Sequence, residues 1–150
     1  MTERRTSPVV PVEEVPPAGM HSYRPAVLVV DDELTIADTV SEILSRSGYA
    51  VSTAYDAEEA LEIALVNPPE LLLTDVVLPG MSGIELAITL TRIFPQCKVL
   101  LFSGVASTAD LLARAQCEGH NFTLLSKPLH PKELLTKVFE SVRPVSSTAA

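Results

Sequence analysis

The chain has 150 residues, of which 47% are apolar and 20% are charged, a composition typical of one globular domain with a substantial core. Eleven basic residues stand against 19 acidic ones, giving a formal net charge of -8, so we expect neither nucleic acid nor an anionic membrane as a direct partner. Two cysteines, Cys97 and Cys117, form neither a metal-binding nor a disulfide pattern, which favours a cytoplasmic protein.

Residues 1–25 contain five prolines and no apolar periodicity, which predicts a disordered N-terminal arm. The pattern of a folded domain runs over 26–143, and residues 144–150 are expected to form a flexible tail. No second domain is expected after residue 143, so the pattern favours a stand-alone protein over a regulator with its own DNA-binding domain.

Short, continuously apolar runs recur along the domain. They cover residues 26–30, 71–73, 99–102 and 122–125, and a weaker run over 49–54 contains alternating polar residues. Continuous runs of this length are typical of parallel strands that are buried on both faces, whereas alternation suits a more exposed edge strand.

Amphipathic helical patterns separate these runs. We expect helices around residues 36–44, from the N-cap Asp56 to Asn67, over 83–94 behind the N-cap Ser82, from Ser107 to about Gly119, and over 131–143 with a core face of Leu134, Leu135, Val138 and Phe139. Five strands in strict alternation with five helices predict an α/β fold, namely a doubly wound parallel sheet with helices on both faces.

Polar side chains follow the strongly apolar strands. Asp31 and Asp32 follow the first strand, Asp75 the third and Ser103 the fourth, while Lys127 lies just past the fifth. Ligands of open α/β sheets bind outside the carboxyl ends of the strands, so we expect these residues to share one pocket. Crowded carboxylates raise one another's pKa, and a divalent cation such as Mg²⁺ relieves their repulsion.

Such a pocket suits phosphoryl chemistry. A lysine ammonium and a serine hydroxyl can each bind a phosphoryl oxygen, and a carboxylate can attack phosphorus to form an acyl phosphate. One such residue alone is usually a cap or loop residue, but five residues at one edge of a sheet favour a functional site.

The residues around these positions resemble a known family. Residues 29–33, 73–83, 102–104 and 126–128 are similar, in this order and spacing, to the motifs of response regulator receiver domains in two-component signalling, including chemotaxis regulators. The resemblance covers residues 26 to about 143. It implies a flavodoxin-like, five-stranded parallel sheet of strand order 2-1-3-4-5.

The resemblance also implies a role for each polar residue. Asp75 would be the phosphoacceptor, and Lys127 would pair with the phosphoryl group. Asp31, Asp32 and Asp75 would hold Mg²⁺ together with the backbone carbonyl of Val77. The implied cofactor is therefore Mg²⁺.

A conformational switch is implied as well. Ser103 would move to the phosphoryl group and complete a catalytic trio with Asp75 and Lys127. Leu124 stands where receivers commonly carry a switching Tyr or Phe, which is a departure from the family pattern. The peptide bond between Lys127 and Pro128 is expected to be cis.

The implied phosphoryl donor is a histidine kinase or a histidine phosphotransfer protein, and the downstream protein is unknown. We expect a monomer or a phosphorylation-dependent dimer that is not an enzyme beyond phosphorylation and dephosphorylation of its own Asp75. Two alternatives stay open. One is a pseudo-receiver that binds a partner without phosphorylation, and the other is an aspartyl-phosphate phosphatase, which would need an aspartate where Val77 stands.

Overall fold

The computed structural model describes residues 23–104, 113, 119 and 122–142. They form one five-stranded parallel sheet of order β2-β1-β3-β4-β5. The strands are β1 (Ala26–Val30), β2 (Ala50–Ala54), β3 (Leu71–Asp75), β4 (Lys98–Ser103) and β5 (Thr123–Ser126), and the described helices are α1 (Leu34–Arg46), α2 (Ala57–Val66), α3 (Gly83–Ile93) and α5 (Pro131–Val142). The predicted fold and strand order are confirmed.

Three predicted segments fall largely outside the described residues. They are residues 1–22 of the arm, most of the helix expected from Ser107 to Gly119, and the tail over 144–150. Within the described part of the chain, no helix is both long enough and apolar enough to cross a membrane.

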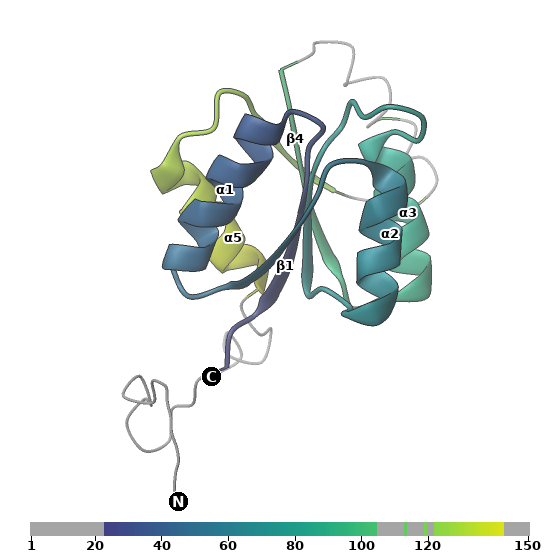
Figure 1. The fold of residues 1–150 in the computed structure, drawn as a ribbon, viewed down its shortest axis with the longest axis horizontal. Coiled ribbons are helices and arrows are strands. Elements are labelled where there is room, and N and C mark those ends of the chain that lie inside the picture. Colours follow the sequence, from purple (N-terminus) through teal and green to yellow (C-terminus); the bar gives the residue numbers. More distant parts are fainter. Residues whose placement is uncertain (1–22, 105–112, 114–118, 120–121, 143–150) are drawn as a thin grey trace, which may run out of the picture.

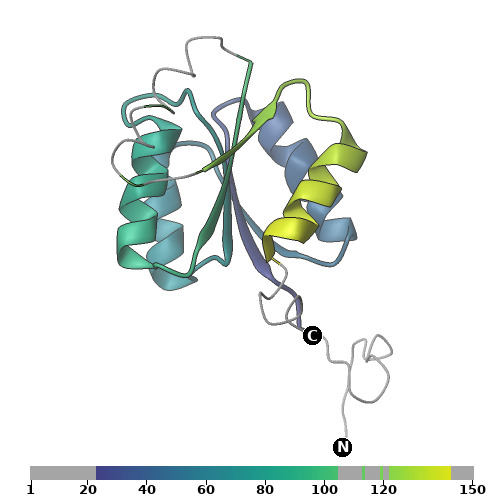
Figure 2. The ribbon, with the colours of Figure 1, turned by 180° about the vertical axis from the view of Figure 1, so that it is seen from behind.

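The sheet separates two layers of helices (Figures 1 and 2). Helices α1 and α5 cover one face, and α2 and α3 cover the other. Alternation along the strands divides the core between these faces. On β3, Leu72 packs on the α2 and α3 side, whereas Leu71 and Leu73 pack on the α1 and α5 side. All five residues of β3 are buried, and β2 is an edge strand, as the patterns predicted. The continuous apolar run over 122–125 predicted burial on both faces, which is wrong, because β5 is the other edge strand and only Leu125 of its four residues is buried.

The predicted caps fix where two helices begin. The Asp56 carboxylate accepts a hydrogen bond from the Glu59 amide at 2.7 Å at the start of α2. Ser82 and Glu85 form a reciprocal capping box at the start of α3, with hydrogen bonds of 3.1 and 3.2 Å. These bonds satisfy amide groups that the first turn of a helix leaves without partners. The cap of α3 is important because this helix begins beside the end of β3.

The predicted core face of α5 is wrong at Phe139. Leu134 and Val138 are buried and Leu135 packs partly against the core, but Phe139 keeps 55% of its surface exposed. Successive residues of a helix are rotated by about 100°. Phe139 therefore lies a quarter-turn beyond Val138, outside the stripe that faces the sheet.

We predict that the Cys97 thiol resists alkylation in the folded protein. The side chain is buried beside β4, and burial raises its pKa from 9.0 to about 11. The folded state therefore binds the thiol proton more tightly than the unfolded chain, and its stability falls as pH rises through that interval. In a Cys117→Ser variant, iodoacetamide should label Cys97 slowly at a pH of about 8 and rapidly in denaturant. Equal labelling rates in the two states would contradict this prediction.

Candidate functional site

The sheet register brings the predicted polar residues to one edge. Asp75 at the end of β3 pairs with Phe102 on β4, and Ser103 pairs with Ser126 on β5. The Lys127 amide donates to the Ser103 carbonyl at 3.1 Å, so the chain beyond β5 continues along the same edge. The carboxyl ends of the strands therefore position side chains that are far apart in the sequence.

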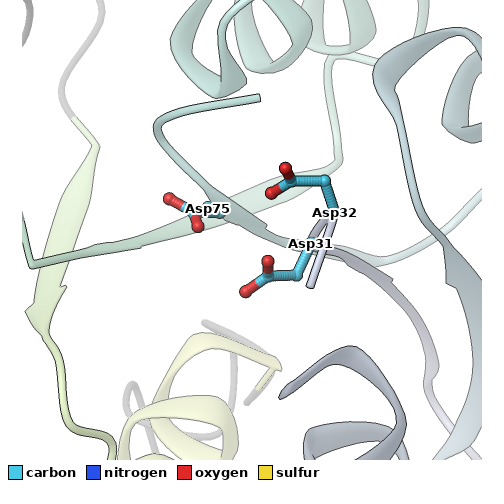
Figure 3. Close-up of side chains that lie close together, drawn as sticks. All are labelled: Asp31, Asp32 and Asp75. Carbon is cyan, nitrogen blue, oxygen red and sulfur yellow. The ribbon is translucent and has the colours of Figure 1, made fainter. Parts of the chain in front are cut away.

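Three carboxylates lie together at this edge. One oxygen from each of Asp31, Asp32 and Asp75 lies within 4.8 Å of the others, and Figure 3 shows the three carboxyl groups side by side. Asp31 is fully buried and Asp75 nearly so, whereas Asp32 is exposed. We call Asp31, Asp32, Asp75 and Lys127 the acidic pocket.

Lys127 links two carboxylates of the acidic pocket, those of Asp31 and Asp75. Its Nζ lies 2.8 Å from Asp75 Oδ2, 3.3 Å from Asp31 Oδ2 and 3.8 Å from Glu33 Oε1. The first two contacts are hydrogen bonds donated by the ammonium to largely buried carboxylates. One positive charge thus partly compensates the negative charges that the strand ends bring together.

Charge and burial oppose each other in this pocket. Burial raises the pKa of Asp31 and the charge of Asp75 adds to this effect, although the Glu33 amide and Lys127 act in the opposite direction. Burial also lowers the pKa of Lys127, but hydrogen bonds and charge from Asp75 and Asp31 outweigh it and leave that pKa raised. The surroundings therefore favour the charged form of Lys127 and disfavour that of Asp31, and a further cation would relieve the repulsion between the carboxylates.

The turn after β3 fixes the Asp75 carboxylate. The Val77 amide donates to Asp75 Oδ1 at 3.0 Å, while Oδ2 accepts from Lys127. The Val77 side chain is 51% exposed, so its backbone, rather than its side chain, contacts this aspartate. Both carboxylate oxygens of Asp75 are held from different directions.

The two predicted switch residues occupy different environments. Ser103 is buried at the end of β4, at the same edge as the acidic pocket. Leu124 on β5 is 37% exposed, and its neighbour Leu125 packs in the α1 and α5 core, so alternation turns Leu124 toward the opposite face. The Lys127–Pro128 bond is cis.

Three further residues of this site were not predicted from the sequence. Glu33 contacts Lys127, and the Phe102 ring lies beneath Lys127 Nζ, with 5.1 Å between Nζ and the ring centroid. Gly83 lets α3 begin against β3, because a Cβ there would lie 1.9 Å from the backbone oxygen of Asp75. Strand alternation could have indicated Phe102, because it places residues 100, 102 and 125 on one face. No sequence pattern indicates the close approach of Gly83 to the backbone of β3.

These features coincide with those of a known family. The family model for the response regulator receiver domain matches residues 27–139, a span that includes the acidic pocket, Val77, Ser103 and Leu124. The chain belongs to the response regulator receiver domain family. It is therefore a receiver of two-component signalling. Members of this family are not enzymes beyond the phosphorylation of their own receiver domain.

Individual relatives agree with this assignment. The transcriptional regulatory protein YvrH of Bacillus subtilis is 32% identical over 114 residues, which make up 75% of this chain and 47% of YvrH. A receiver domain protein of Methanospirillum hungatei is 30% identical with a TM-score of 0.73, over 80% of this chain and 94% of that one. The chemotaxis response regulator CheY4 of Vibrio cholerae is 29% identical with a TM-score of 0.69, and the match covers 79% of this chain and 99% of CheY4.

The receiver spans about half the length of the curated relatives it matches. The activities in the names of those relatives belong to the whole proteins. What the comparisons share with this chain is the receiver domain, and the acidic triad of this chain is typical of an Mg²⁺-binding receiver site. Histidine kinases are the partners of the family as a whole.

Proposed function

We propose that this receiver accepts a phosphoryl group on Asp75 from the phosphohistidine of a histidine kinase or a histidine phosphotransfer protein. The observation that carries the proposal is the environment of the Asp75 carboxylate. It is 6% exposed at the residue level, lies 2.8 Å from the Lys127 ammonium, and shares a pocket with two further carboxylates. A nucleophile and a cation that can bind the transferring group are thus held together.

The donor set of the pocket fits Mg²⁺. Three carboxylates offer hard oxygen ligands within 4.8 Å of one another, and the exposed Asp32 leaves the site open to water, which Mg²⁺ usually retains as a ligand. In the proposal, Asp31, Asp32 and Asp75 hold the ion with the Val77 carbonyl. The bound ion would supply positive charge beside the transferring phosphoryl oxygens.

The reaction uses groups that the fold already orients. A carboxylate oxygen of Asp75 attacks phosphorus, the bond from phosphorus to the donor imidazole breaks, and its electron pair stays on the imidazole nitrogen. The product is an acyl phosphate on Asp75. Lys127 stays protonated and pairs with a phosphoryl oxygen, and the Ser103 hydroxyl donates to another.

Phosphorylation would then change how the receiver contacts other proteins. The proposed unit is residues 26–143, located in the cytoplasm, and it passes the signal by phosphorylation-dependent contact or by onward phosphotransfer. Ser103 and Leu124 are the proposed switch positions, and the phosphoryl group shifts the balance between two conformations. Leu124 is a partly exposed aliphatic side chain on β5, so the proposed switch at this position works without an aromatic ring.

Incubation with acetyl phosphate and Mg²⁺ tests the proposal. Intact-protein mass spectrometry should show the gain of one phosphoryl group, EDTA should prevent it, and peptide mapping after borohydride reduction should locate it at Asp75. A pseudo-receiver would gain no phosphoryl group under the same conditions. Absence of the gain in folded protein, or its location at another residue, would overturn the proposal.

A further inference from the structure

The ammonium of Lys127 has a partner besides the carboxylates. Its Nζ lies over the ring of Phe102, 5.1 Å from the ring centroid. A cation within about 6 Å of an aromatic centroid is attracted by the negative face of the ring. Lys127 is therefore held by Asp31 and Asp75 through hydrogen bonds of 3.3 and 2.8 Å and by an aromatic face as a third contact.

The fold makes the Phe102 ring a rigid support. Phe102 is fully buried, and it packs in the α1 and α5 core with Leu125 and Leu134. It pairs in register with Asp75, and its carbonyl accepts a hydrogen bond from the Val76 amide at 3.1 Å. The ring and the Asp75 carboxylate are thus positioned by the same pair of neighbouring strands.

We propose that Phe102 is a positioning residue for phosphoryl transfer, whose ring face holds the Lys127 ammonium beside Asp75. This inference rests on the proposed function of the acidic pocket. A lysine side chain is long and flexible, and fixing it costs conformational entropy. A buried ring beneath the ammonium restricts it before the phosphoryl group arrives, so less of that cost falls on the reaction step.

Glu33 is a competing partner for the ammonium. Glu33 Oε1 lies 3.8 Å from Lys127 Nζ, and its side chain is 64% exposed. Glu33 therefore offers the ammonium a partner at the solvent side of the pocket, away from the buried Asp31 and Asp75. The ring adds attraction at the buried side, where the ammonium can still reach the group on Asp75.

Proton NMR of the unphosphorylated protein without Mg²⁺ tests the geometry. Protons above an aromatic face resonate upfield, so the ε-methylene protons of Lys127 should be shifted upfield relative to those of the other lysines. The shift should disappear in Phe102→Leu, which keeps an aliphatic side chain in the core. Unshifted Lys127 protons in the wild type would overturn the inference.

Site-specific incorporation of fluorinated phenylalanines at residue 102 tests the role. Each added fluorine weakens the negative face of the ring while the side chain keeps nearly the same shape. We expect the rate of phosphorylation by acetyl phosphate with Mg²⁺ to fall stepwise, by about threefold to tenfold from phenylalanine to the trifluoro form. Melting temperatures measured on the same samples would show whether the fold is retained.

The same series at Phe94 is the matched control. Phe94 is the C-cap of α3 and packs on the other face of the sheet, so its fluorination should leave the rate unchanged. Equal rates across the Phe102 series in a protein that is still phosphorylated would overturn the inference and leave the proposed function intact. No phosphorylation of the folded wild type would instead overturn the proposed function, and the positioning role with it.

Discussion

Replacing Asp75 with asparagine is expected to abolish phosphoryl uptake from acetyl phosphate in the presence of Mg²⁺. The amide oxygen is a poor nucleophile, and removal of a nucleophile typically lowers the rate by far more than a hundredfold. We do not expect Asp31 to replace Asp75, because the Asp31 side chain is fully buried whereas that of Asp75 keeps 9% of its surface exposed. Intact mass and peptide mapping on both proteins provide the measurement.

The fold should survive this substitution. An asparagine oxygen at residue 75 can still accept from the Val77 amide, as Asp75 Oδ1 does at 3.0 Å, and Lys127 keeps its contact with Asp31. Removing one crowded carboxylate also lowers the charge repulsion in the pocket, so the melting temperature without Mg²⁺ should not fall. Asp38→Asn is the matched control, since Asp38 lies on α1 and bonds the Tyr55 hydroxyl. If Asp75→Asn gains a phosphoryl group as fast as Asp38→Asn, Asp75 is not the acceptor.

Much of the fold could be predicted because its patterns are local. The apolar run over 71–73 predicts a strand that is buried on both faces. The N-caps Asp56 and Ser82 predict the first residues of two helices, because a cap acts on the first turn that follows it. The prediction was wrong at Phe139 because the width of the buried stripe depends on how α5 lies on the sheet. Helical periodicity gives the direction of an apolar face, but it does not give the width of the contact.

The part of the candidate site that lies at the strand ends could be predicted from the sequence. Asp31, Asp32 and Asp75 follow apolar runs, and parallel strands bring such ends to one edge of the sheet. The contacts of Lys127 with Glu33 and with the Phe102 ring depend on the path of one flexible side chain, which no local pattern describes. Side-chain paths and close backbone approaches are the parts that required the structure.

The close approach at Gly83 leads to the second large expected effect, a loss of stability in Gly83→Ala. Alanine is usually favoured over glycine in a helix by about 1 kcal/mol. Here the added Cβ would lie 1.9 Å from the Asp75 oxygen and 2.9 Å from its carbonyl carbon, both of them backbone atoms. Helix α3 would have to move away from β3, and it would lose the 2.8 Å hydrogen bond from the Gly83 amide to the Val76 carbonyl.

The steric term should outweigh helix propensity because the obstructing atoms belong to the backbone of a fully buried strand. We expect Gly83→Ala to lower the free energy of unfolding by about 3 kcal/mol, measured by urea denaturation. Gly104→Ala is the matched control at the same edge of the sheet, since its Cβ would meet only the Lys127 Cβ at an ordinary 3.6 Å. Similar unfolding free energies for the two variants would show that α3 can move away from β3 at little cost, and the backbone contact with Asp75 would then not be what fixes the start of this helix.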